Sequence, residues 1–256
     1  MKKQLIAATL AALTSGMAQA DFLRVEAGAG IWQSEPSGKL TYKASGGTET
    51  INAADDLGYK QENVSYLWLN VKHPVPVLPN FRLEYTDPAF EGNTTKSVSW
   101  NGISYGANTY SKLAVKQTDV VLYYNLLDNT FWATLDLGLD VKLADFSYKL
   151  SDPANILTGY NESASLVIPL LYARTRAQIP GTGIGLEADL KYISLGNTTV
   201  YDARAKVDYT FTAVPVVQPA IELGYRTQKF SVDEADYDVN TDIDFSGIYG
   251  GVMLRF

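Results

Sequence analysis

Residues 184–192 read IGLEADLKY, and their alternation raises the question that decides the fold. One face of an extended strand would carry Ile184, Leu186, Ala188, Leu190 and Tyr192, and the other Gly185, Glu187, Asp189 and Lys191. In a water-soluble sandwich the apolar face packs on a core and the charged face meets solvent. In a membrane-spanning barrel the apolar face meets lipid, and the charged face lies inside. The stretch also has the length of a tilted spanning strand, about 9–11 residues.

Alternation of this kind recurs about ten times along the chain. The predicted strands cover residues 23–31, 66–72, 81–85, 117–126, 131–143, 163–178, 184–192, 201–211, 221–228 and 248–256. Within 163–178, Pro169 removes a backbone donor and predicts a bulge. An even number of strands places both ends of the chain on one side of the membrane, as single-chain bacterial barrels require.

The connections between these strands alternate in length. Short links, expected at the periplasmic end, cover 73–79, 127–129, 180–183 and 214–219; the intervening links are mostly long and cover 33–63, 86–112, 146–162, the brief 195–199, and 231–242. Short periplasmic turns with longer outer loops are typical of outer-membrane barrels. Asn101-Gly102, between SVSW and ISY, predicts a type I′ hairpin in one outer loop.

Aromatic residues on the predicted lipid face gather at the strand ends. Phe81, Phe131, Phe211 and Phe256 fall at periplasmic ends, and Tyr85, Tyr192 and Tyr201 fall at outer ends. Two such girdles are expected where a barrel crosses the membrane interfaces. We therefore predict an all-β, transmembrane, antiparallel up-and-down β-barrel over residues 21–256, with ten strands preferred and eight or twelve as alternatives. The apolar face of IGLEADLKY is then the lipid face.

The first twenty residues have the features of a cleaved secretory signal peptide. Lys2 and Lys3 are followed by an apolar stretch and by Ala18-Gln19-Ala20, a cleavage-site pattern. The chain has no cysteine, which excludes disulfides and thiolate metal sites. A formal net charge of -7 argues against a nucleic-acid partner, which would need clustered Lys and Arg.

The chain resembles the outer-membrane β-barrel proteins of Gram-negative bacteria over essentially all of its length after residue 20. The final residues, YGGVMLRF, resemble the C-terminal strand that the barrel-assembly machinery reads in this superfamily, which gives Val252, Leu254 and Phe256 that role. HPVPVLPNFRLEYT (73–86) and Gly250-Gly251 are similar to a small uncharacterised family with a glycine pair near the C-terminus. The resemblance implies the bacterial outer membrane as location, with membrane lipid and lipopolysaccharide as partners, and brings no activity.

The predicted lumen is rich in charges of both signs. Its cations are Arg24, Lys72, Arg82, Lys142, Arg174, Arg176, Lys191, Arg204, Lys206, Arg226 and Arg255, and its anions are Glu26, Glu84, Asp119, Asp136, Asp140, Glu187, Asp189, Asp202, Asp208 and Glu222. Because the two lists nearly balance, and buried charges are tolerated when paired, we expect a salt-bridge network that fills the lumen and leaves at most a narrow polar path. The function this favours is structural or surface interaction; a narrow porin-like channel for small polar solutes or ions is the alternative.

Catalysis has few candidate residues. The only histidine, His73, falls at the periplasmic end and precedes Pro74, where a turn role explains it. One histidine and no cysteine give no Ser-His-Asp or metal constellation at that site. A carboxylate-only pair, and with it an outer-membrane hydrolase, stays as a lesser alternative, so we expect no enzyme.

The outer loops hold two further candidate sites. Asp236, Asp238, Asp242 and Asp244 alternate in DYDVNTDID and could collect Ca²⁺ or Mg²⁺. The spacing lacks the Gly and terminal Glu of an EF-hand loop, so we favour a solvated acidic loop and expect no resident cofactor. Trp100, Tyr105 and Tyr110 could contact a host or phage surface.

Overall fold

The computed structural model describes residues 23–44, 47–75, 77–130, 133–153, 159–213, 216–232 and 239–256. The proposed signal peptide, Phe131, Asp236 and Asp238 lie outside these residues. All regular structure in the described part is β-strand. No helix there has the length and apolar character needed to cross a bilayer.

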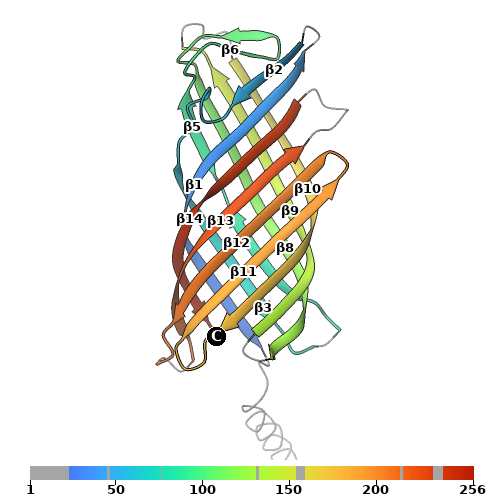
Figure 1. Cartoon of the computed structure of the whole chain (residues 1–256), viewed down its shortest axis with the longest axis vertical. Helices are drawn as coiled ribbons and strands as arrows, with labels where there is room; N and C mark the ends of the chain where they lie inside the picture. Colours follow the sequence, from blue (N-terminus) through green and yellow to red (C-terminus); the bar gives the residue numbers. More distant parts are fainter. Residues whose placement is uncertain are drawn as a thin grey trace, which may run out of the picture.

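Ten strands close into one antiparallel barrel, which confirms the predicted fold class (Figure 1). Around the wall they are β1 (Arg24–Ala44), β3 (Glu62–Lys72), β4 (Asn80–Thr86), β8 (Tyr110–Thr130), β9 (Ala133–Ser151), β10 (Gly159–Gln178), β11 (Ile184–Leu195), β12 (Thr198–Thr210), β13 (Gln218–Val232) and β14 (Val239–Arg255). β14 pairs with β1, from Glu26↔Arg255 to Tyr42↔Val239, and so closes the wall.

Four shorter strands lie at the outer end. β2 (Gly47–Asn52) pairs with the end of β1, and β5 (Ala89–Asn93) continues the line of β4 along β8. β6 (Val98–Trp100) and β7 (Ile103–Tyr105) form a separate hairpin. Its turn residues, Asn101 and Gly102, have φ angles of 53° and 71°. Both angles are positive, as a type I′ turn requires, so the hairpin prediction is confirmed.

The strands differ greatly in length, which gives the barrel a stepped outer rim (Figure 1). β1 and β8 have 21 residues each and β10 has 20, about twice what a spanning strand needs. β11 has only 12 and β12 has 13. The interpretation of 33–63 and 146–162 as loops was therefore wrong for much of their length, because the strands continue well above the membrane.

The predicted bulge at Pro169 was also wrong. β10 pairs with β9 without interruption from Gly159↔Ser151 to Ala177↔Ala133, and Pro169↔Val141 lies within this run. β11 begins to pair with β10 only at Leu171↔Tyr192. Proline is tolerated where its nitrogen faces no partner strand, so the missing N–H costs no ladder bond here. The irregularity lies instead between β8 and β9, near Leu127.

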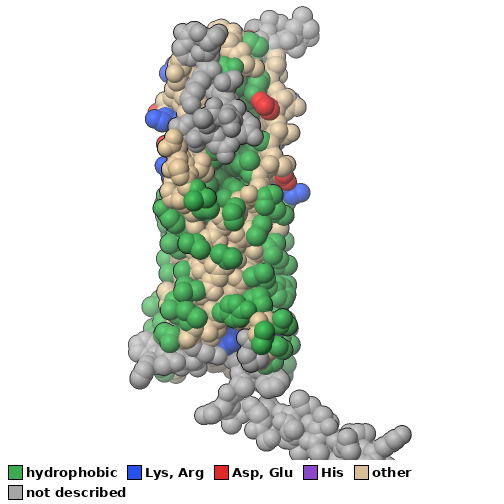
Figure 2. Space-filling view, turned by 90° about the vertical axis from the view of Figure 1, so that its right-hand side faces the viewer, with side chains coloured by type: hydrophobic (Ala, Val, Ile, Leu, Met, Phe, Trp, Pro, Cys, Tyr) green, Lys and Arg blue, Asp and Glu red, His purple; other side chains and the backbone are tan. Residues whose placement is uncertain are grey.

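The lower part of the barrel is apolar outside and charged inside, as the opening stretch predicts. In β11, Leu186 and Leu190 are 49% and 42% exposed on the outer face, whereas Lys191 is fully buried inside. Figure 2 shows apolar side chains gathered across the lower half of the face in view, with most of the charged side chains above them. We call this banded half the membrane part. Its polarity suits a lipid surround.

Above the band the polarity reverses, and we call this half the outer part. In β9, Leu139 and Leu143 point outward, whereas Ala144 and Leu150 point inward and are buried. In β14, Ile248 points outward, whereas Phe245 points inward and is fully buried. The hydrophobic residues of one strand thus change face between the two parts. The outer part is packed like a water-soluble barrel, with its core inside.

Candidate functional site

The lumen of the membrane part is the candidate site, because it gathers charged side chains that a barrel interior must neutralise. The structure pairs ten cations with ten carboxylates there: Arg24, Arg82, Lys142, Arg174, Arg176, Lys191, Arg204, Lys206, Arg226 and Arg255 with Glu26, Glu84, Asp119, Asp136, Asp140, Glu187, Asp189, Asp202, Asp208 and Glu222. Nearly all are buried, and Arg24 is partly exposed at the periplasmic end. Lys72, also predicted inward, is partly exposed at the same end.

Two arginines of β10 organise the periplasmic side of this network. Arg174 lies 2.8 Å from Asp136 on β9 and 2.7 Å from Glu187 on β11. Arg176 donates from Nη1 to Oδ2 of Asp208 at 2.5 Å and from Nη2 to Oδ1 at 3.0 Å. Arg174 therefore joins β10 to the strands on either side, and Arg176 reaches past β11 to β12. The planar fork of arginine suits this bridging of carboxylates.

The seam where the barrel closes carries its own ion pairs. Arg255 on β14 donates to Glu26 on β1 at 2.9 Å and to Asp208 on β12 at 2.8 Å. Glu26 also accepts a hydrogen bond from Arg24 at 2.9 Å. Arg255 lies one residue before the C-terminus, so the last strand is fixed to the first by charge as well as by backbone pairing.

A second cluster surrounds Glu84 on β4. Its oxygens lie 2.5 Å from Arg82, 2.8 Å from Lys191 and 2.6 Å from Arg204. Arg204 also binds Asp189, at 2.8 Å. β11 and β12, which supply Lys191 and Arg204, are not neighbours of β4 in the wall. The cluster therefore crosses the lumen.

The outer side of the network rests on Lys142 and Asp202. Lys142 lies 2.7 Å from Asp119 and 3.5 Å from Asp202. Asp202 also accepts hydrogen bonds from Arg226 at 2.7 Å and from Gln228 at 2.7 Å. Asp140 differs from these carboxylates: it is fully buried, its nearest cation is Lys191 at 4.0 Å, and neither of its oxygens has a hydrogen-bond partner among the described residues.

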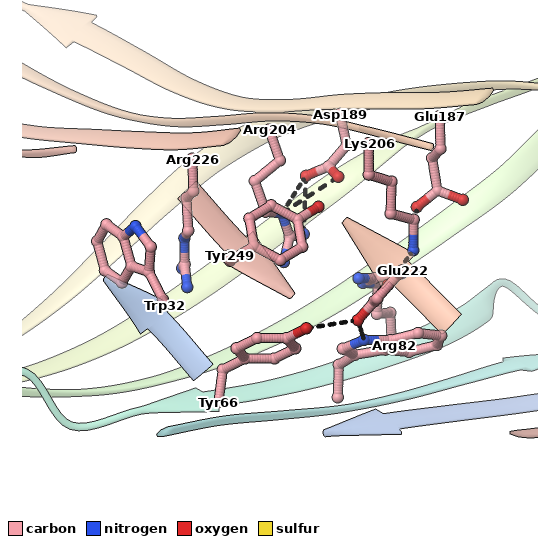
Figure 3. A pocket seen from close by; sticks show the side chains of 11 residues that line it. Trp32, Tyr66, Arg82, Glu187, Asp189, Arg204, Lys206, Glu222, Arg226 and Tyr249 are labelled. Carbon is pink, nitrogen blue, oxygen red and sulfur yellow. Dashed lines mark hydrogen bonds and ion pairs between the residues drawn. The ribbon is translucent and has the colours of Figure 1, made fainter. Parts of the chain in front are cut away.

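Aromatic side chains add hydrogen bonds and ring contacts to this network (Figure 3). Glu222 accepts hydrogen bonds from Tyr66 at 2.8 Å and Trp68 at 3.1 Å, and an ion pair joins it to Lys206 at 2.7 Å. The Trp68 ring faces Arg82, whose guanidinium carbon is 4.7 Å from the ring centroid. Such a contact stabilises a cation that has lost its water.

Almost no free space remains among these side chains. The cavity between Trp32, Tyr66, Glu222, Arg204 and Tyr249, seen in Figure 3, has a volume of about 10 Å³. A cavity of this size holds about one water molecule. This cavity therefore has no room for a solute larger than water.

A second closure, which we did not predict, fills the outer part. Phe90 stacks on Phe245 with ring centroids 5.3 Å apart, and Phe146 meets Phe230 edge-on at 5.3 Å. Trp100 from the β6–β7 hairpin lies above them, 5.6 Å from Tyr148. These rings belong to one hydrophobic cluster of buried side chains. The change of hydrophobic face within β9, β13 and β14 was the feature of the sequence that could have revealed it.

Residues 53–59 fold inward and cap this core. Ala53 and Leu57 are fully buried, and the Tyr59 hydroxyl lies 2.5 Å from that of Ser111 on β8. Gly58 has a φ of +70°, and a Cβ there would lie 2.6 Å from the carbonyl oxygen of Asn93. Only glycine fits this close approach.

Asp56 ties the same segment to the end of β2 and to the loop between β5 and β6. It accepts the backbone N–H of Asn52 at 2.9 Å, and Lys96 lies 2.8 Å from its other oxygen. Burial acts to raise the pKa of Asp56, but the Asn52 N–H and the Lys96 ammonium outweigh it and lower that pKa below its usual value. The carboxylate is thus held in its charged form.

The remaining predicted sites have fewer side-chain contacts. The His73 ring lies 3.0 Å from the Pro79 carbonyl oxygen, and its Nδ1 accepts the Val75 N–H at 3.1 Å, within one periplasmic turn. Asp242 lies 2.7 Å and Asp244 3.5 Å from Lys229. No group of three potential ligands for a metal ion occurs among the described residues. The ion site that included Asp236 and Asp238 stays a prediction.

Comparison with known proteins supports the fold. No family model matches the chain, and no curated protein matches it in sequence. The outer membrane protease OmpT from Escherichia coli is similar in structure, with a TM-score of 0.53 at 9% identity over 91% of this chain and 97% of OmpT. The translocator domain of the autotransporter NalP from Neisseria meningitidis gives a TM-score of 0.45 at 12% identity, over 100% of this chain and 95% of that domain. Neisserial surface protein A gives 0.32 at 12% identity, over 93% and 99%.

At these identities the likeness to OmpT concerns the fold alone. The closed antiparallel wall, the apolar band and the enclosed charges are those of an outer-membrane β-barrel. Together they assign the chain to the bacterial outer membrane, with its strands across the lipid.

Proposed function

We propose that this protein is a sealed outer-membrane barrel that carries a rigid outer part for interaction at the cell surface, without catalysis. The observation that carries the proposal is the double closure of the lumen. Paired charges fill the membrane part, around a cavity of about 10 Å³, and stacked aromatic rings fill the outer part. A lumen filled in this way would leave no path for a solute.

The outer part supports the surface role. A barrel whose only task was to anchor itself in lipid would need strands of about 9–11 residues. β1, β8, β9 and β10 are each at least 19 residues long, and they build a core of their own above the band. Such a core makes the raised rim rigid, which suits recognition of a partner.

We propose no enzymatic role because the described residues do not form a catalytic site. The single histidine is held in a periplasmic turn by Pro79 and Val75. The carboxylates inside the barrel are nearly all engaged by cations at 2.5–3.5 Å, so they are not presented to a substrate. Hydrolysis assays on peptide, ester and glycoside substrates with the refolded protein would test this part, and turnover of any of them by the purified, folded barrel would overturn it.

The decisive test is the conductance of the refolded protein in a planar bilayer. The sealed-barrel proposal expects no discrete current steps at moderate voltage. The alternative, a narrow channel, expects steps whose ion preference shifts in Arg204→Glu and Asp189→Lys, since these residues face the lumen. Steady conductance with such a shift would overturn the proposal.

A further inference from the structure

Among the described wall strands, β10 leaves a long edge unpaired, which starts at the top of the membrane part and runs up the outer part. β10 pairs with β9 over its whole length, but with β11 only from Leu171 to Gln178. The residues Gly159–Leu170 therefore have a partner on one side only, and no described strand pairs with their other side. We call this stretch the free edge. It begins where the β10–β11 pairing stops, at Leu171↔Tyr192, a few residues before the short β11–β12 turn.

The free edge presents backbone groups that can still bond. In an antiparallel ladder, alternate residues direct N–H and C=O toward opposite neighbours. Pro169 sits in the unbroken β9–β10 ladder without a register shift, so its nitrogen faces away from β9. Ser165 and Val167 share that orientation and hence direct their own N–H and C=O groups toward the free edge.

The composition of the free edge favours pairing rather than protection. Natural edges are guarded by charges and proline. Here Glu162 and Pro169 stand at the two limits, and the run between them, SASLVI, has neither charge nor proline. Leu166 and Ile168 lie half-buried on its inner face, and Ile193 lies half-buried on β11 beside the gap. Apolar side chains at alternate positions of an added strand would cover them.

A second copy of the chain in the same membrane does not fit this edge. Both copies would stand with their outer ends up, so a two-fold axis along the membrane normal would relate their β10 strands. With strands tilted by about 35–45° the two edges would cross at about twice that angle instead of running antiparallel. The occupant must therefore approach as a separate extended segment.

We propose that the free edge binds an extended polypeptide segment of another protein by strand addition. The segment would span about six residues, with apolar side chains at alternate positions. This rests on the proposed function, because it names the partner class of the surface role. Main-chain hydrogen bonds would supply affinity, and the contacts with Leu166, Ile168 and Ile193 would supply preference.

The probe is a fluorescein-labelled peptide with the sequence of residues 143–151, LADFSYKLS. In the barrel this sequence already pairs with β10 residues, from Leu143↔Val167 to Ser151↔Gly159. Anisotropy of the peptide is titrated with the refolded barrel in nanodiscs. We expect saturable binding, and no binding of the same peptide with proline at its central serine.

Two variants of the free edge test the mode of binding. Ser165→Pro removes one edge donor while the pairing with β9 persists, as it does at Pro169. Val167→Lys places a charge on an outward side chain that is 68% exposed. Each should weaken binding about tenfold or more, the scale of one lost hydrogen bond with its contacts. Ser165→Thr keeps the donor and should bind as the parent does. Folding of each variant is checked by its resistance to SDS.

The outcomes separate the two proposals. The edge proposal is overturned if the peptide fails to bind at millimolar concentration, or if both variants bind it unchanged. If Ser165→Pro does not fold, Val167→Lys alone decides. Conductance is recorded on the same preparation. Current steps together with peptide binding would reject the sealed-barrel proposal and support the edge proposal. No current steps and no peptide binding would support the sealed-barrel proposal and reject the edge proposal.

Discussion

The Nη2 atom of Arg204 on β12 lies 2.6 Å from Oε1 of Glu84 on β4, across the lumen. In the cyclic order of the ten wall strands these two strands stand opposite each other. The pair therefore ties one side of the barrel to the other without any backbone contact. Since Glu84 also engages Arg82 and Lys191, one carboxylate holds three cations in place.

Removal of that carboxylate should destabilise the barrel strongly. In Glu84→Ala the three cations stay buried and lose their common partner. Breaking a buried pair on one side costs about 3–5 kcal/mol. The measurement is the free energy of unfolding in urea, with the protein in lipid vesicles. Glu91→Ala is the matched control, because Glu91 pairs with Lys112 on the surface and its side chain is 51% exposed; its loss should have a much smaller effect, since solvent screens the pair. Equal losses in the two variants would refute the role of the lumen network.

Alternation in the sequence predicts that Arg204 and Glu84 both point inward, but it does not predict that they form an ion pair. Parity along a strand fixes which face a side chain occupies. The distance between two inward side chains depends also on strand tilt and on the stagger around the wall, which no single strand encodes. The strand number, the lipid face and the Asn101-Gly102 turn follow from local pattern, and the structure confirms them.

The outer core was missed for a different reason. One hydrophobic face was expected for each strand, so residues 146–150 and 239–242 were expected to lie in loops, whereas they belong to β9 and β14. In fact the hydrophobic face changes within a strand: Leu143 is outward and 43% exposed, whereas Ala144 is inward and 1% exposed. The change marks the point where the surround passes from lipid to water. In the sequence, the outer core is marked by strands whose apolar residues change from odd to even positions, or from even to odd.

That switch predicts two environments along one face of β9. Leu139 and Lys149 both point outward, and Leu139 is 61% exposed. Because the chain has no cysteine, a single spin label can be placed at either position. We expect the label in Leu139→Cys to collide mainly with oxygen dissolved in lipid, and the label in Lys149→Cys to collide mainly with a water-soluble nickel chelate. The same accessibility at both positions would contradict the division into a membrane part and an outer part.

The aromatic core of the outer part should contribute to stability as the core of a soluble protein does. Phe245 is fully buried between Phe90 and Phe230. We expect Phe245→Ala to lower the free energy of unfolding by about 3–5 kcal/mol, since it leaves a cavity in a packed core. Val252→Ala, on the lipid face of the same strand, should cost about 1 kcal/mol or less, because lipid fills the space. The two variants are compared by urea unfolding, and a larger loss in Val252→Ala would contradict the assignment of faces.

Acid should loosen the segment at residues 53–59. The pKa of Asp56 is lower in the folded protein than in the unfolded chain, because the Asn52 N–H and Lys96 outweigh the effect of burial. Its contribution is therefore complete above the unfolded pKa, about 3.9, and is lost as the pH falls through the lower folded value. We expect amide exchange at residues 53–59, corrected for intrinsic rates, to become faster in that acid range. Asp56→Asn should exchange faster already at neutral pH and lose the dependence. Asp55→Asn, with an exposed side chain, is the control and should keep it.

The two neighbouring glycines near the C-terminus, Gly250 and Gly251, face opposite sides of the wall, so the same substitution at each can be compared. A Cβ on Gly251 would lie 2.4 Å from the Ala29 carbonyl oxygen and 2.4 Å from the Tyr66 hydroxyl, whereas one on Gly250 would meet its nearest atom at 3.5 Å. Tyr66 crosses the seam between β1 and β14 and donates to Glu222. An added methyl group at Gly251 must displace backbone at the closure or break this hydrogen bond.

We therefore expect Gly251→Ala to lower the free energy of unfolding by about 1–3 kcal/mol, the usual cost of overpacking. Gly250→Ala should be neutral, or stabilising by about 0.4–1 kcal/mol, because it restricts the unfolded chain. Urea unfolding of both variants in the same vesicles measures the difference. If the two substitutions have equal effects, the close approach at the seam does not explain the glycine at 251. If Gly251→Ala is harmful only when Tyr66 is present, and harmless beside Tyr66→Phe, the clash lies at the hydroxyl and not at the Ala29 carbonyl.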